Sequence, residues 1–241
     1  MTQYKAYIQS VNGIPIDDWS YTAYQGFKNR GTNIILFENI EEVPVSRYNF
    51  VIAFIEDTVK YLAKMGIDAK RGLNIPEELY PFAGRQIKVM TMDEFIREEP
   101  VPVFVKPHTE VKQFPAGVIT KMEYKQMFLG EYDKDTLVQT SSLIDIAAEY
   151  RGFVLNKELI SLNMYMGDLH YYPDVSIIEK AIDAFKNQPV GYTIDFCVTR
   201  DNRTLLIECN DGWSIGSYGC LPNIYVRLLV ARWMEMLKGA K

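Results

Sequence analysis

Short runs of alternating apolar and polar residues favour strands in the N-terminal part of the chain, with helical periodicity between them. The runs cover residues 5–9, 33–38 and 50–55, and a polar helix is predicted after the first. Asp57 is a candidate N-cap for a helix whose apolar positions follow helical spacing, and Gly66 is placed to end that helix. The pattern predicts a small α/β unit.

A turn-rich stretch at residues 74–84 separates this unit from the rest, so we expect a domain boundary there. Beyond it the pattern predicts a brief helix at residues 93–98. Strands are predicted at residues 101–106, 117–122, 136–140 and 152–155. Two amphipathic helices complete the pattern, one starting near Asp174 and one following Pro222.

Composition narrows the classes of function. The chain has 241 residues, 48% of them apolar and 24% charged, as in an ordinary globular protein. Its 26 Lys and Arg against 31 Asp and Glu give a net charge of −5, which disfavours general binding to nucleic acid or to anionic membranes. With only two histidines, we expect carboxylates, lysines and arginines to carry any chemistry.

The cellular location is predicted from cysteine usage and from apolar runs. Cys197, Cys209 and Cys220 are too few and too irregularly spaced for a disulfide framework, which favours a reducing compartment. No apolar run approaches the roughly 20 residues of a membrane-spanning helix. The N-terminus also lacks the layout of a signal peptide. We therefore expect a cytoplasmic protein without a membrane partner.

The most informative segment covers residues 191–212, GYTIDFCVTRDNRTLLIECNDG, and predicts a hairpin. Asp and Asn tolerate the backbone angles of a tight turn, and a two-residue loop at 201–202 puts Asp195 directly opposite Glu208. Because side chains alternate along a strand, Asp195, Glu208 and Asn210 share one face. The opposite face is predicted to hold Ile194, Phe196, Leu205, Ile207 and Cys209, and Cys197 is predicted to lie opposite Leu206.

Two carboxylates in such a pair repel one another, because directly opposed β-carbons lie about 4.5–5.5 Å apart. A divalent cation between them relieves the repulsion, and carboxylate and amide oxygens suit Mg²⁺. The spacing leaves two other interpretations open: a solvated acidic face on an edge hairpin, or a carboxyl pair that shares one proton. A slip of one residue in the register would reverse the two faces.

The spacing of Asp195, Glu208 and Asn210, followed by DGWSIG, resembles the metal-binding signature of the ATP-grasp superfamily of carboxylate–amine ligases. Three other segments agree with that family in order: VFVKP with Lys106, LVQTSSLI from Leu137, and EYRGFVLNKELI from Glu149. The likeness covers about residues 95–241. It is closest to a phage and bacterial clade named for its arginines and lysine.

The resemblance implies an α+β fold in which two α+β lobes clasp the nucleotide. Residues 1–90 would form the preceding small α/β domain, and residues 91–241 the ATP-grasp domain. The two lobes of that domain would cover about residues 91–140 and 141–241.

Carried over residue by residue, the resemblance implies ATP and Mg²⁺ as cofactors. Lys106 would contact the phosphates, Glu149 the ribose, and Arg151 the transferred phosphoryl group or the acyl phosphate. The alternative for Arg151 is an ion pair with Glu149 or Asp145 on a surface strand. Adenine would be received by Gln139 and by the backbone at Thr140, Ser141, Ser142 and Leu143. One or two Mg²⁺ would be held by Asp195, Glu208 and Asn210.

The chain departs from the family in its phosphate loop, which is Gly- and Ser-rich in many members. Here it reads PHTEVKQFPAG, in which Lys112 is a candidate nucleotide contact and equally a solvated lysine. His108, beside the phosphate strand, is a further candidate contact. Residues after the hairpin are candidates for the substrate site, with packing as the alternative for the aromatic ones: Asp211, Trp213, Ser214 and Tyr218.

The resemblance thus implies an ATP- and Mg²⁺-dependent ligase that joins a carboxylate to an amine through an acyl phosphate. The substrates expected are small molecules or peptides, with no nucleic acid, and the oligomeric state is open. Two alternatives are a nucleotide-binding regulatory module that has lost turnover and a phosphotransferase of the same fold. We expect Asp195→Asn or Glu208→Gln to abolish turnover and leave the fold intact.

Overall fold

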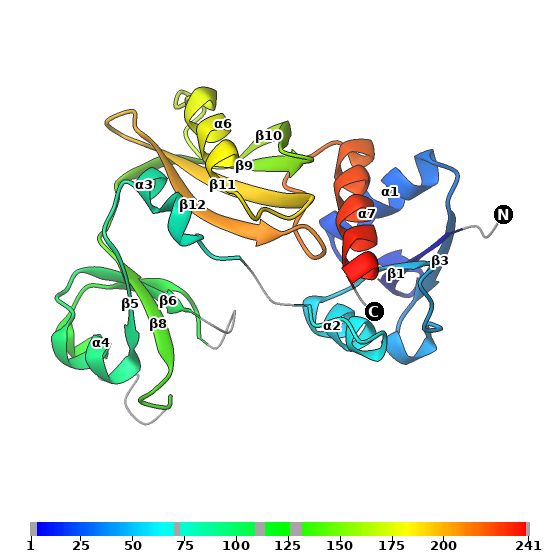
Figure 1. The fold of residues 1–241 in the computed structure, drawn as a ribbon, viewed down its shortest axis with the longest axis horizontal. Coiled ribbons are helices and arrows are strands. Elements are labelled where there is room, and N and C mark those ends of the chain that lie inside the picture. The colour runs from blue at the N-terminus through cyan, green and yellow to red at the C-terminus, as the bar shows by residue number, and fades with distance from the viewer. Residues whose placement is uncertain (1–3, 70–72, 109–113, 126–131, 240–241) are drawn as a thin grey trace.

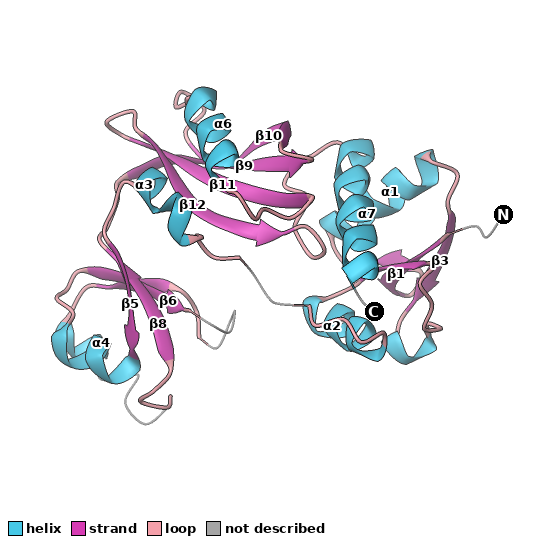
Figure 2. Ribbon diagram, in the orientation of Figure 1, coloured by secondary structure: helices cyan, strands magenta, loops and turns pink. Residues whose placement is uncertain are grey.

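The structure is a computed structural model that describes residues 4–69, 73–108, 114–125 and 132–239. Within these ranges, three four-stranded sheets follow one another along the chain, and helices flank each sheet (Figures 1 and 2). In this part of the chain no helix combines the length and the apolar character needed to cross a bilayer.

The first sheet belongs to the N-terminal unit and is mostly parallel. Its elements are β1 (Lys5–Val11), β2 (Ile14–Pro15), α1 (Asp18–Asn29), β3 (Asn33–Phe37), the 3-10 helix η1 (Ile40–Glu42), β4 (Asn49–Ile52) and α2 (Ile55–Lys64). β1 pairs in parallel with β3 and β4, and antiparallel with β2. The predicted start of α2 at Asp57 is wrong, because the helix begins at Ile55. The Asp57 side chain accepts a hydrogen bond from Gln9 (2.8 Å) and does not cap the helix.

The second sheet has the strand order β5-β8-β6-β7, and all its pairs are antiparallel. This part contains η2 (Glu77–Leu79), α3 (Tyr80–Ala83), β5 (Ile87–Thr91), α4 (Met92–Glu98), β6 (Val103–Pro107), β7 (Gly117–Ile119), α5 (Met122–Lys125) and β8 (Leu137–Ser141). A reciprocal capping box between Thr91 and Glu94 starts α4. Residue 90, the expected end of the N-terminal domain, lies within β5, and β5 pairs with β8 of this sheet.

The third sheet is antiparallel, with the order β10-β9-β11-β12. Its elements are β9 (Ile146–Leu155), β10 (Glu158–Gly167), α6 (Val175–Ala184), β11 (Gly191–Thr199), β12 (Thr204–Asp211) and α7 (Pro222–Gly239). Apolar side chains of α6, among them Ile178 and Ile182, pack with Ile194 and Phe196 on one face of this sheet. The other face carries the polar residues of the predicted site.

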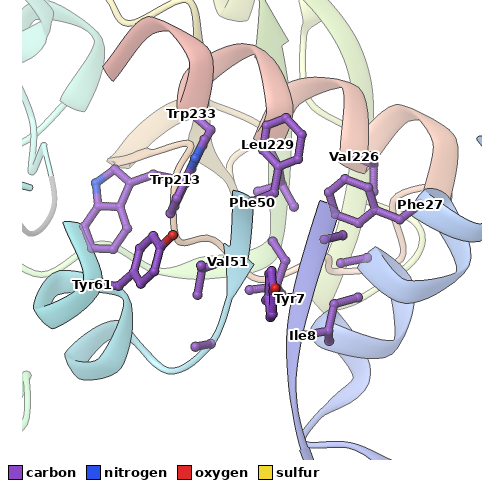
Figure 3. Close-up of a cluster of buried hydrophobic side chains, with 14 of the residues drawn as sticks. Tyr7, Ile8, Phe27, Phe50, Val51, Tyr61, Trp213, Val226, Leu229 and Trp233 are labelled. Atoms are coloured by element: carbon purple, nitrogen blue, oxygen red, sulfur yellow. The ribbon is translucent and has the colours of Figure 1, made fainter. Parts of the chain in front are cut away.

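The C-terminal helix α7 returns to the N-terminal unit and joins its core (Figure 1). Val226, Leu229 and Trp233 of this helix pack with Phe27 and Phe50 of the first unit (Figure 3). The largest apolar cluster therefore contains both ends of the described chain, and it anchors the segment that leads from β12 into α7.

Close contact between α1 and α7 depends on Gly26. A β-carbon at this position would lie 2.4 Å from the carbonyl oxygen of Pro222 and 2.5 Å from Cγ2 of Val226. We expect Gly26→Ala to lower the free energy of unfolding by about 1–3 kcal/mol, because the two helices must separate. Urea denaturation measures this loss. Gly117→Ala is the control, since a β-carbon there meets no atom of the described residues within 4 Å, and equal stability of the two variants would contradict the prediction.

Candidate active site

The hairpin of β11 and β12 places Asp195 directly opposite Glu208, as the sequence predicts. The register then shifts at a bulge: Phe196 faces Leu206, and Ile207 is the extra residue. Cys197 therefore lies opposite Leu205, and the predicted pairing of Cys197 with Leu206 is wrong. Leu205 was predicted on the same face as Ile194 and Phe196, but the bulge places it on the opposite face. Leu206 takes its place in the apolar cluster behind the sheet.

The turn of the hairpin explains the difference in register. It has three residues between Thr199 and Arg203, whose backbone groups are hydrogen-bonded (3.0 Å). Asn202 adopts a positive φ of 62°, the left-handed conformation that Asn tolerates. The loop is thus one residue longer than predicted, and the bulge at Ile207 restores the pairing of the two acids.

Arg85 holds the bulge from the side of the second sheet. Its guanidinium donates to the carbonyl oxygens of Leu206 (2.6 Å) and Ile207 (3.2 Å), and also to that of Ala83 (3.1 Å). Burial lowers the pKa of Arg85. The sequence did not reveal this role, because the two carbonyl groups at the bulge lie more than a hundred positions away.

Asp195 is ion-paired with Arg151, the residue directly opposite it on β9. Nε of Arg151 donates to Oδ1 of Asp195 (2.8 Å), and Nη2 donates to Oδ2 (2.6 Å). Both side chains are buried. Burial raises the pKa of Asp195 to about 6, although Arg151 acts in the opposite direction.

Glu208 connects the third sheet to the second. It accepts a hydrogen bond from Nδ2 of Asn210 (3.0 Å), and its Oε2 lies 3.9 Å from Nζ of Lys106 on β6. Burial lowers the pKa of Lys106, and the charge of Glu208 partly offsets this effect. A phosphate oxygen near Lys106 would therefore gain a desolvated cation as its partner.

A cavity of about 210 Å³ lies between the two sheets at this point. Its lining includes six residues predicted from the sequence: Lys106, Gln139, Ser141, Ser142, Leu143 and Glu208. Seven residues that were not predicted complete it: Arg85, Phe104, Ala116, Val118, Ile144, Ile146 and Ile207. The combination of apolar walls with a few charged groups is typical of a small-molecule site.

Two polar side chains of the second sheet lack partners within the described residues. Gln139 lies directly opposite Lys106, and its buried Oε1 accepts no hydrogen bond. Thr140 is fully buried with an unpartnered hydroxyl, but it does not line the cavity.

His108, the residue after β6, also has a buried Nδ1 without a partner among the described residues. Burial lowers the pKa of His108, and the charge of Lys106 lowers it further. Lys112 lies outside the described residues.

Glu149 lies two residues before Arg151 on β9 and accepts a hydrogen bond from the hydroxyl of Tyr165 (2.5 Å). Tyr165 belongs to β10, which the sequence analysis did not predict, although Leu162, Met164 and Met166 alternate there with polar neighbours. Its ring meets the ring of Tyr218, with centroids 4.8 Å apart. These aromatic residues border the polar face of the sheet beside Arg151.

Three of the candidate substrate residues, at the end of β12 and just beyond it, lie elsewhere. Asp211 forms a bidentate ion pair with Arg232 of α7 (2.6 and 2.7 Å), and Trp213 is only 5% exposed, within the core. Both line a second cavity of about 370 Å³ with Arg232 and Glu235. The backbone N–H of Ser214 donates to the carbonyl oxygen of Asp211 (3.4 Å). The structure does not bring these three residues to the cavity of Lys106.

Comparison with known proteins identifies the fold. A family model described as an ATP-grasp domain, the second family of its clade, matches residues 82–228, more than half of the chain. The chain belongs to this ATP-grasp family. No curated protein matches its sequence. Its ATP-grasp domain contains the whole hairpin and both sheets that line the cavity.

Solved structures agree with the ATP-grasp assignment at the level of the fold. D-alanine–D-alanine ligase from Bacillus anthracis has a TM-score of 0.60 at 10% identity, with 99% of each chain covered. A RimK domain ATP-grasp protein from Sphaerobacter thermophilus has a TM-score of 0.58 at 14% identity, covering 96% of this chain and 97% of its own. The ATP-grasp ligase PsnB, complexed with a minimal precursor, has a TM-score of 0.52 at 10% identity, covering 95% and 99%.

Proposed function

We propose that this ATP-grasp protein is an ATP- and Mg²⁺-dependent ligase that joins a carboxylate to an amine, on a small-molecule or peptide substrate. The observation that carries the proposal is the approach of Lys106 and Glu208, from two different sheets, at the cavity between those sheets. A cation for phosphate and a carboxylate for metal are thereby held next to one another. The ATP-dependent ligases of the same fold support the reaction class.

The nucleotide would occupy the cavity between the sheets. Gln139, with its unpartnered Oε1, and the backbone of residues 140–143 would receive adenine, since an amide oxygen accepts from an exocyclic amino group. Lys106 would bind phosphate, and Glu149 the ribose. Arg85 adds a second partly buried cation to the lining of the cavity.

The donor set fits Mg²⁺ in its chemistry. Asp195, Glu208 and Asn210 offer two carboxylates and one amide oxygen on neighbouring strands, and hard oxygen ligands are those that Mg²⁺ prefers. Among the described residues, no group of three or more His, Cys, Asp or Glu is placed to hold a metal, so the amide is needed to complete this set. Bound Mg²⁺ would supply charge neutralisation for the β- and γ-phosphates.

The remaining chemistry uses groups of this chain. A substrate carboxylate oxygen attacks the γ-phosphorus, the bond to the bridging oxygen of ADP breaks, and an acyl phosphate forms. Lys106 and Arg151 offset negative charge on the transferred phosphoryl oxygens. An amine then attacks the acyl carbon, orthophosphate leaves, and the amine loses a proton. The step requires no histidine or cysteine nucleophile, in keeping with the composition of the chain.

Release of ADP in the presence of a panel of amino acids and short peptides, with and without hydroxylamine, tests the proposal. A carboxylate-dependent release of ADP that yields a hydroxamate with hydroxylamine indicates an acyl phosphate and supports the ligase. Release of ADP with a stable phosphorylated product would instead indicate a phosphotransferase. Nucleotide binding without release of ADP under any condition would indicate a regulatory module.

Metal binding should depend on pH through Asp195. Its carboxyl group is ionised above its pKa of about 6 and protonated below it, and a metal ligand must be deprotonated. We expect the dissociation constant for Mn²⁺, used without nucleotide as a spectroscopic substitute for Mg²⁺, to rise about tenfold from pH 7 to pH 5. Electron paramagnetic resonance measures free Mn²⁺ directly. A constant affinity over this interval would remove Asp195 from the ligand set.

A further inference from the structure

Arg151 is held along one edge and over one face. Asp195 occupies Nε and Nη2, which fixes that edge of the planar group. The ring of Tyr218 covers a face, with the Arg151 Cζ atom 4.1 Å from the ring centroid. A guanidinium has five N–H donors, and within the described residues Nη1 has no hydrogen-bond partner. The edge that carries Nη1 is therefore left for a ligand.

The loop that carries Tyr218 is anchored at both ends. Ile215 and Cys220 are buried in the cluster formed by the N-terminal unit and α7. The hydroxyl of Tyr225 donates to the carbonyl oxygen of Ile215, and the carbonyl oxygen of Gly219 accepts from Asn163 of β10 (3.0 Å). These contacts hold the two ends of the loop in place, and they thereby limit where the Tyr218 ring can lie.

The backbone of this loop is adapted to the ring of Tyr218. Tyr218 has a positive φ of 43°, which is uncommon for a bulky residue and is retained where the surroundings impose it. Gly219 follows with a φ of 76°. A β-carbon at Gly216 would lie 2.6 Å from the ring of Tyr218, so the ring packs directly on that glycine. Tyr165 contacts the ring in an edge-to-face arrangement.

Packing alone does not account for this arrangement, since the Tyr218 side chain is 41% exposed while Arg151 is 6% exposed. A partly exposed tyrosine with an unfavourable backbone angle gains little from burial. Its attraction to a desolvated guanidinium is larger than at the surface, because the ring quadrupole then acts without competing water. We therefore attribute the conformation of this loop to the contact between the Tyr218 ring and Arg151.

We propose that Tyr218 is a positioning residue that fixes the plane of the Arg151 guanidinium, so that its Nη1 edge faces a tetrahedral phosphate oxyanion in the cleft. The inference rests on the proposed function, in which that oxyanion is the transferred phosphoryl group. Asp195 alone fixes the edge but leaves the plane of the guanidinium free to tilt about the line through Nε and Nη2. Tyr218 removes this tilt.

Three substitutions separate the ring from the rest of the residue. Tyr218→Phe keeps the ring, whereas Tyr218→Leu and Tyr218→Met remove it at a partly exposed position. Tyr172→Leu is the matched control, because Tyr172 is a 73% exposed tyrosine on the loop between β10 and α6. The probe is inorganic phosphate, added to protein that is saturated with Mg²⁺ and ADP.

We expect the Leu and Met variants to bind phosphate about tenfold more weakly than the wild type, as loss of a desolvated cation–π contact implies. Tyr218→Phe and Tyr172→Leu should stay within about twofold. In ¹⁵N-resolved NMR spectra the Nε–H signal of Arg151, assigned from its loss in Arg151→Lys, should lose its upfield ring-current shift only where the ring is absent.

Unchanged phosphate affinity and an unchanged Arg151 signal in the Leu and Met variants would overturn the inference. So would an equal loss of affinity in Tyr218→Phe, because the hydroxyl rather than the ring would then matter. Failure of the ligase proposal has a different signature: the wild type would release no ADP with any carboxylate and bind no phosphate. The Arg151 signal would still decide whether Tyr218 holds the guanidinium.

Discussion

Glu208→Gln should reduce carboxylate-dependent ADP release about 10²–10³-fold and leave the stability of the protein unchanged. The amide keeps the size of the side chain but removes the negative charge that faces Lys106. The Glu208 side chain is 36% exposed and lies 3.9 Å from Nζ of Lys106, so the loss of this loose ion pair should cost little stability. Steady-state kinetics with a coupled ADP assay and urea denaturation measure the two effects.

A matched control for this variant is Glu158→Gln. Glu158 is an exposed acid at the start of β10 in the same sheet, away from the hairpin that carries Glu208. Its replacement should change neither the rate nor the stability. If Glu208→Gln retained the rate of the wild type, Glu208 would have no part in the reaction.

Asp195→Asn should have the largest effect on stability, lowering the free energy of unfolding by about 3–5 kcal/mol. Its carboxylate is the partner of Arg151 in a buried bidentate pair, and the amide would leave that guanidinium as an uncompensated buried charge. The expectation from the sequence, that this substitution leaves the fold intact, is therefore replaced. Urea denaturation of the variant beside Glu208→Gln gives the difference directly.

The double variant Arg151→Met with Asp195→Leu distinguishes a lost pair from a lost contact. Removing both charges and filling the space with apolar groups should restore most of the stability, since the cost lies in the unpaired charge. Activity should stay absent in this variant. Equal stability of Asp195→Asn and the wild type would mean that Arg151 finds another partner or water.

The pairing of the two acids was predictable because it depends on local features. Alternation along the strands and a turn tolerant of positive φ determine which side chains share a face, and Asn202 supplies that conformation. The bulge at Ile207 was not predictable, because the carbonyl oxygens at this point are held by Arg85 from another sheet. The turn is one residue longer than predicted, and the bulge adds one residue to β12, so the two differences cancel at the pair of Asp195 and Glu208.

The surroundings of the acids depend on contacts that are distant in the sequence. Arg151 meets Asp195 across β9 and β11, and nothing local in either segment specifies a bidentate pair. Asp211, which follows Asn210 in the sequence, was predicted as a polar contact of the substrate site. On a strand, however, the next residue points to the other face, where Arg232 of α7 pairs with it.

The cleft between the second and third sheets should bind Mg²⁺ and ATP for transfer of the γ-phosphoryl group. A crystal structure with Mg²⁺ and a non-hydrolysable ATP analogue is the decisive measurement. We predict adenine beside Gln139, the γ-phosphate between Lys106 and Arg151, and Mg²⁺ in contact with Asp195, Glu208 and Asn210. A nucleotide bound elsewhere, or a triphosphate without metal near Glu208, would contradict the claim.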